Sequence, residues 1–158
     1  MNHALNTSSQ ARALERQAFV DSHWRTGATL HALPADASTR RYFRVEGASL
    51  LLMDSPPQHE PLRPYLQVAG LLAGLGLSAP RVLAADEAAG LALIEDFGHA
   101  TYTRLFAAGH AEAPLYELAV DCLAQLHAAP VDEGAVLPAY DDRCLADEFA
   151  LFIDWYAP

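Results

Sequence analysis

The stretch "ASTRRYFRVEGASLLLMD", residues 37–54, decides the fold. Its first half mixes arginines with aromatic and β-branched side chains, and its second half is an apolar run. Glu46-Gly47 between the halves is a typical turn pair. The stretch therefore predicts two antiparallel strands joined by a tight turn.

Side chains on a strand point alternately to the two faces of the sheet. This alternation predicts one face with Arg40, Tyr42 and Arg44, and the opposite face with Arg41, Phe43 and Val45. Two guanidiniums around an aromatic ring suit an anion with a planar group nearby. An edge strand with solvated arginines explains the same pattern, so both interpretations stay open here.

The regions around this hairpin predict an α+β fold. A helix is expected over residues 8–24 and another over 62–76, where Gly74 and Gly76 end it. Residues 78–98 predict two more strands with a turn at Ala89-Gly90, and the chain beyond residue 100 is helical. The expected order is helix, two strands, helix, two strands and then helices only, with a boundary near Gly98.

Composition excludes several function classes. The 158 residues are 52% hydrophobic and carry a net charge of −10, which argues against an open nucleic-acid surface but permits a nucleotide pocket. All ten cations are arginine, so mechanisms that need a lysine of this chain are excluded. The N-terminal residues lack the pattern of a signal peptide and no apolar run is long enough to span a membrane, so we expect a cytoplasmic protein. Cys122 and Cys144 are expected to be buried small hydrophobes.

The tripeptide Asp96-Phe97-Gly98 matches the magnesium-binding motif of protein kinases, but its surroundings do not. No His-x-Asp precedes it, and it follows directly on the apolar strand "LALI", where strands give way to helices. In a kinase-like layout that place is the hinge, which contacts adenine through backbone groups. We therefore expect adenine contact from the backbone of residues 95–97 rather than a metal at Asp96. An ordinary strand-to-helix turn is the alternative.

The kinase lysine and its glutamate partner are both missing. Met53 or Asp54 stands where kinases carry the lysine of the strand after the phosphate hairpin. The following helix has Gln67 and no acid in its middle. Burying a glutamate without a cationic partner costs free energy. A protein that lacks the lysine is therefore expected to lack the glutamate as well. Either arginine replaces the lysine or the protein is no kinase.

Six segments in order resemble the aminoglycoside phosphotransferase family of kinase-like enzymes. They are "DASTRRYFRV", "SLLLMDSPP", "GLSAPRVLAAD", "GLALIEDFG", "LYELAVDCLAQLH" and "LPAYDDRCLADEFALFIDWY". Within that family they are most similar to bacterial sugar kinases acting on N-acetylmuramate and N-acetylglucosamine at the anomeric position. The resemblance implies an ATP-binding, protein-kinase-like N-lobe over residues 1–98 and the first helices of a helical C-lobe over 99–158. It also implies a role in recycling cell-wall amino sugars.

The resemblance assigns roles to particular residues. Ser38 would lie at the tip of the phosphate loop, Arg40 and Arg44 would replace the lysine, and the hinge would span Glu95, Asp96 and Phe97. An apolar adenine slot would be lined by Tyr42, Leu51, Met53 and Ile94. Replacing Arg40 or Arg44 by alanine would then weaken MgATP binding.

Two departures from the family limit what this chain is expected to do. Ala35-Asp36 stands where the family has Gly-Asp. The catalytic loop and the magnesium ligands are expected beyond residue 158, so no catalytic residue is assigned within the chain. The aromatic stretch "FALFIDWY", residues 149–156, needs a cover: either the remainder of the C-lobe or a partner chain. A non-catalytic kinase-like binding module and an unrelated acidic α+β fold are the alternatives.

Overall fold

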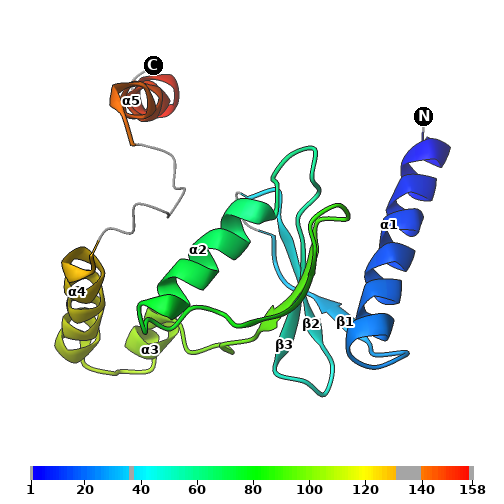
Figure 1. Cartoon of the computed structure of the whole chain (residues 1–158), viewed down its shortest axis with the longest axis horizontal. Coiled ribbons are helices and arrows are strands. Elements are labelled where there is room, and N and C mark those ends of the chain that lie inside the picture. The colour runs from blue at the N-terminus through cyan, green and yellow to red at the C-terminus, as the bar shows by residue number, and fades with distance from the viewer. Residues whose placement is uncertain (1, 36–37, 131–139, 157–158) are drawn as a thin grey trace.

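The computed structural model describes residues 2–35, 38–130 and 140–156. Within them lie five strands and five helices, so the predicted α+β class with a kinase-like N-lobe is confirmed (Figure 1). The elements follow the order α1 (Asn2–His23), β1 (Leu30–Ala32), β2 (Arg41–Val45), β3 (Leu50–Asp54), α2 (Arg63–Gly74), β4 (Val82–Asp86), β5 (Leu91–Glu95), α3 (Tyr102–Ala107), α4 (Glu112–Ala128) and α5 (Asp142–Tyr156).

The five strands form one antiparallel sheet in the order β1-β2-β3-β5-β4. The predicted turn between β2 and β3 is confirmed, with Gly47 at φ 71°. The turn between β4 and β5 ends at Gly90, whose φ is 66°. A Cβ on Gly90 would lie 2.0 Å from the carbonyl oxygen of Ser55, so this turn requires glycine for both its backbone angle and its close approach.

Two boundaries differ from the prediction. β1 was not expected, because three residues followed closely by Pro34 give no measurable alternation. The first helix begins at Asn2 rather than near residue 8, so residues 8 and 9 lie inside the helix. Helix formers on both sides of the serines allow this extension.

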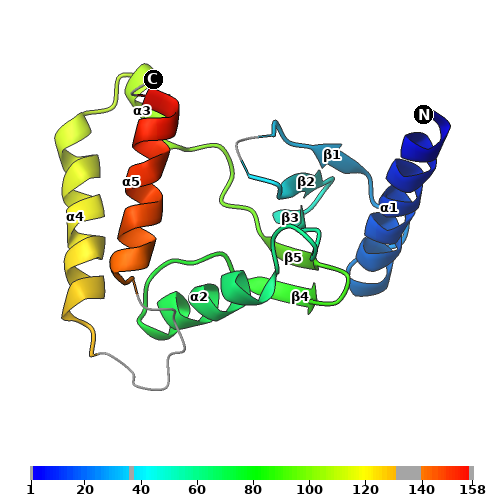
Figure 2. The ribbon, with the colours of Figure 1, turned by 90° about the horizontal axis from the view of Figure 1, so that it is seen from above.

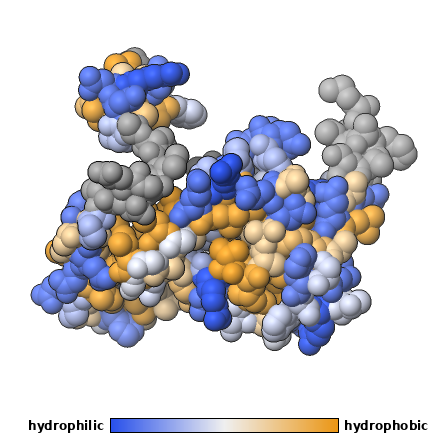
Figure 3. Space-filling view, viewed as in Figure 1, coloured by the Kyte–Doolittle hydropathy of each residue, from blue (hydrophilic) through white to orange (hydrophobic). Residues whose placement is uncertain are grey.

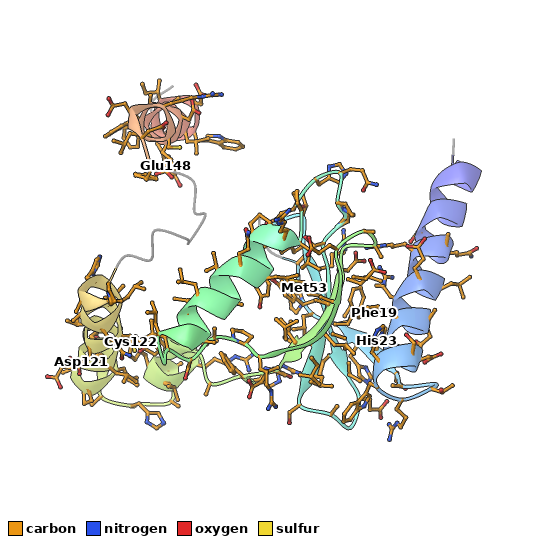
Figure 4. The ribbon with its side chains drawn as sticks, in the orientation of Figure 1. Phe19, His23, Met53, Asp121, Cys122 and Glu148 are labelled. Atoms are coloured by element: carbon orange, nitrogen blue, oxygen red, sulfur yellow. The ribbon has the colours of Figure 1, made fainter. Side chains whose placement is uncertain are left out.

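The core consists of two clusters, one on each face of the sheet. In Figures 1 and 2 the sheet lies between α1 and α2. The cluster on the α1 face contains Phe19, Val20, Val45, Leu50, Leu52, Leu91 and Leu93. The cluster on the α2 face contains Met53, Leu62, Ala92 and Ile94. Figure 4 shows Phe19 and Met53 on these two sides. Alternate residues of β3 and β5 thus enter different cores.

The C-terminal helices α3, α4 and α5 bury little of their surface against the rest of the described residues. Tyr102 of α3 donates a hydrogen bond to Leu115 O at 2.9 Å, and Gln125 of α4 donates to Leu75 O at 2.9 Å. On α5, Phe149 and Trp155 are 71% and 77% exposed. In the space-filling view, hydrophobic surface crosses the middle of the visible face and also lies on α5 (Figure 3).

The prediction of buried cysteines is wrong. Cys122 on α4 is exposed and Cys144 on α5 is half-buried (Figure 4). The apolar spacing of both helices suggested burial, but no residue of either is buried. Across the described residues, no helix has the length and hydropathy needed to cross a membrane.

Candidate functional site

The four residues of the predicted apolar slot gather on the α2 face of the sheet. Met53 and Ile94 are 0% and 3% exposed, and Tyr42 and Leu51 are half-buried against the same cluster. Register explains part of this grouping, since Tyr42 faces Met53 and Leu51 faces Ile94 across neighbouring strands. In this arrangement only Tyr42 and Leu51 offer surface to a ligand, while Met53 and Ile94 form the layer beneath them.

Arg40 and Arg41 lie on opposite faces, as the alternation predicts. The Arg40 guanidinium lies 5.5 Å from the centroid of the Tyr65 ring on α2. Arg41 pairs with Asp54 across β2 and β3, on the face that α1 covers. Two arginines adjacent in sequence thus serve different sides of the sheet.

The loop before β2 directs its polar groups at one carboxylate. The hydroxyls of Ser38 and Thr39 each donate to Glu60 Oε2 at 2.9 Å, and Arg40 Nη2 lies 3.1 Å from Glu60 Oε1. These hydrogen bonds, that of Ser38 first, hold the pKa of Glu60 below its usual value. The Nε of Arg40 is buried without a hydrogen-bond partner. The loop before β2 thus binds one anionic group, the Glu60 carboxylate, and keeps one hydrogen-bond donor, Arg40 Nε, without a partner.

The Arg44 side chain is bound by residues that directly follow β5. Its Nε and Nη2 donate to the two carboxylate oxygens of Asp96 at 2.5 and 3.1 Å, and its Nη1 contacts Nε2 of His99. The N–H of Gly98 donates to the same carboxylate at 2.7 Å. The hydrogen bond from Arg44 is the main reason that the pKa of Asp96 is lowered. A phosphate could recruit Arg44 only by breaking this bidentate pair.

Two of the three predicted hinge N–H groups already have partners. Glu95 N–H donates to Arg81 O at 2.9 Å, and Asp96 N–H donates to Ser49 O at 3.0 Å. Phe97 is 58% exposed, and its N–H donates no hydrogen bond to any described residue. The backbone donor left for a ligand at this edge is therefore that of Phe97.

Sequence reasoning missed a buried charge network on the α1 face. The Asp54 side chain is 3% exposed and accepts hydrogen bonds from Arg12 Nε at 3.1 Å, Arg12 Nη2 at 2.6 Å and Arg16 Nη1 at 2.8 Å. Arg12 Nη2 also donates to Ala89 O at 2.8 Å. The available signal was an aspartate closing an apolar strand, because such a carboxylate needs cationic partners once it is buried.

The described residues hold no cluster of three or more histidine, cysteine, aspartate or glutamate side chains that could bind a metal ion. The carboxylate of Asp96 is instead occupied by Arg44 and Gly98.

Comparison with known proteins gives a consistent result. The pattern of the phosphotransferase enzyme family matches residues 10–157. An N-acetylmuramate/N-acetylglucosamine kinase of Pseudomonas aeruginosa is 45% identical over 142 residues, which cover 87% of this chain and 41% of the relative. Proteins of the same name are 36% identical in Caulobacter vibrioides, covering 94% of this chain and 51% of the relative, and 39% identical in Pseudomonas putida, covering 87% and 41%. The chain thus spans about half, or less, of the length of these relatives.

Proposed function

Because this chain belongs to the phosphotransferase enzyme family, as the sequence resemblance predicted, we propose that it is the nucleotide-binding part of an ATP-dependent amino-sugar kinase. The whole protein would phosphorylate N-acetylmuramate or N-acetylglucosamine at the anomeric hydroxyl. The names of its relatives support this substrate class. The same proposal places the protein in the cytoplasm, in recycling of cell-wall sugars.

The observation that carries the proposal is the set of donors around Glu60. Two hydroxyls and a guanidinium converge on the oxygens of one anionic group, and Arg40 Nε remains buried and unpaired. A nucleotide phosphate presents the same kind of oxygen acceptors. We assign Ser38, Thr39 and Arg40 to the phosphates, with Arg40 taking the place of the missing lysine.

The surface beside this loop suits the rest of the nucleotide. Tyr42 and Leu51 offer a half-buried apolar face to the base, supported from beneath by Met53 and Ile94. The Phe97 N–H is the donor for the edge of adenine, next to Glu95 and Asp96. In this assignment Arg44 positions the hinge through Asp96 rather than contacting a phosphate.

Glu60 would compete with the nucleotide. Its carboxylate occupies the donors that a phosphate would use, and the two negative groups repel each other. We therefore expect the loop to exchange Glu60 for phosphate on binding. Glu60 is about one-third exposed, so it can turn toward solvent at little cost.

The remaining machinery belongs to the longer protein that we propose. Bound magnesium would offset the charge of the phosphates, and its ligands and the catalytic base are expected beyond residue 158. Residues 1–98 would form the N-lobe and residues 99–158 the start of the C-lobe. The remainder of that lobe would cover the aromatic residues of α5, which the described part of the chain leaves exposed.

Phosphate transfer by the complete gene product tests the proposal. ATP with either amino sugar should yield ADP and an acid-labile sugar 1-phosphate, and omission of the sugar should stop ADP production. Absence of sugar phosphate with both substrates would contradict the kinase assignment. If this chain alone then binds MgATP, the non-catalytic binding module becomes the better description.

A further inference from the structure

A cavity of about 490 Å³ lies beside α1, and its lining includes Thr39 and Tyr42, which the nucleotide assignment also uses. Its walls come from α1, the end of β1, described residues of the β1–β2 connection, the start of β2, and the end of β3 with the segment after it. Figure 4 shows the side chains that fill the space between α1 and the sheet, around Phe19.

Cations outnumber acids around the cavity. Arg12, Arg16 and Arg41 line it, and Asp54 is the one acid among the lining residues that the structure describes. Asp54 already accepts three N–H bonds from Arg12 and Arg16, so it has little left to offer Arg41. Glu15 lies outside the lining and pairs with Arg12 at 2.7 Å. Even with Glu15 counted, three positive groups face two negative ones.

Two of these guanidiniums have donors to spare. Arg16 uses Nη1 for Asp54, and its guanidinium carbon lies over the Phe43 ring, 4.4 Å from the ring centroid, which leaves its other N–H groups for a ligand. Arg41 pairs in register with Asp54, yet its side chain forms no hydrogen bond or ion pair with any described residue. Stacking on Phe43 fixes the orientation of Arg16, so its donor edge is preorganised.

The protein as a whole repels anions, since its net charge is −10. An anion that binds here must therefore be held by the local donors rather than by the general field. The cavity is also larger than a bare phosphate needs, and Leu33, Phe43 and Pro56 give it an apolar wall.

We propose that this cavity binds a phosphomonoester. The phosphate would accept hydrogen bonds from the edge of Arg16 and from Arg41, and the organic part would lie against Leu33, Phe43 and Pro56. Arg16 and Arg41 lie on the face opposite Arg40, although Thr39 and Tyr42 line both this cavity and the proposed nucleotide site.

The test is a titration of the chain with glucose 6-phosphate, inorganic phosphate and glucose at constant ionic strength, followed by calorimetry and by melting temperature. Glucose 6-phosphate should bind saturably and more tightly than inorganic phosphate, and glucose should not bind. Arg41→Gln should weaken glucose 6-phosphate binding by about 5- to 10-fold, the loss expected for one charge-assisted contact. Arg143→Gln makes the same charge change on α5, where that side chain is 89% exposed, and should leave binding unchanged.

Three results would overturn the proposal: no saturable binding of glucose 6-phosphate, equal weakening by both substitutions, or no effect of Arg41→Gln. Competition between ATP and glucose 6-phosphate would show that the cavity takes nucleotide phosphates instead of a separate ester. Because Arg41 is exposed and unpaired among the described residues, its substitution should not unfold the protein. An unchanged melting temperature of the free variant checks this.

Discussion

The ion pairs on the two faces of the sheet differ in their exposure to solvent. On the α1 face, Asp54 is nearly inaccessible to solvent and is held by Arg12 and Arg16. On the α2 face, the Glu60 side chain paired with Arg40 is 32% exposed, whereas the Asp96 side chain paired with Arg44 is 9% exposed. A buried pair resists separation because neither charge tolerates isolation, whereas a solvated pair exchanges partners readily. The first arrangement suits holding a helix in place, and the second suits binding a ligand.

The largest expected effect tests the buried side of this comparison. Asp54→Asn removes the charge that Arg12 and Arg16 neutralise together, and it should lower the free energy of unfolding by about 3 kcal/mol. Urea denaturation measures the change. Asp121→Asn, on the surface of α4 (Figure 4), makes the same substitution and should stay within about 0.5 kcal/mol of the wild type. Equal effects of the two substitutions would contradict a structural role for the network.

A smaller effect is expected at the end of β5. Asp96→Asn weakens the bidentate contact with Arg44 and should cost about 1–2 kcal/mol at neutral pH. The pKa of Asp96 is lowered in the folded protein, so its stabilisation is complete above the ordinary value of 3.8 and is lost as the pH falls through the lowered folded-state pKa.

The difference in unfolding free energy between wild type and Asp96→Asn should therefore shrink below pH 3.8. Urea denaturation at a series of pH values checks this dependence. A difference that stays constant from neutral to acid pH would mean that the carboxylate charge does not support the hinge.

The smallest expected effect tests the exchange of Glu60 for phosphate on the α2 face. Glu60→Gln keeps the size of the side chain and removes the charge that competes with phosphate, so it should tighten MgATP binding by about 2- to 5-fold. Isothermal titration of the variant measures the change, and Glu87→Gln in the turn after β4 is the matched control. Weaker binding of MgATP to Glu60→Gln would instead make Glu60 part of the nucleotide site.

The part of the fold that depends on local pattern could be predicted. Alternation in residues 40–45 placed Arg40 and Arg41 on opposite faces, and Glu46-Gly47 marked the turn between β2 and β3. β1 was missed because it is three residues long and is identified only by its pairing with β2.

Most of the site's charge partners could not be predicted. The contacts of Asp54 with Arg12 and Arg16 join residues 42 and 38 positions apart, and Arg44 and Asp96 are 52 positions apart. Only packing of α1 and closure of the sheet bring them together. Cys122 was misplaced for a related reason, because apolar spacing shows that a helix has an apolar face but not whether anything covers it. The assignment of the nucleotide to the α2 face stays a prediction.

Titration of MgATP into the Arg40→Gln and Arg41→Gln variants tests that assignment most directly. These neighbours carry the same charge and lie on opposite faces of β2, so general electrostatics should affect them alike. If the nucleotide binds on the α2 face, Arg40→Gln should weaken MgATP binding by about tenfold and Arg41→Gln should leave it unchanged. Equal affinities in the two variants, or a loss confined to Arg41→Gln, would contradict the account.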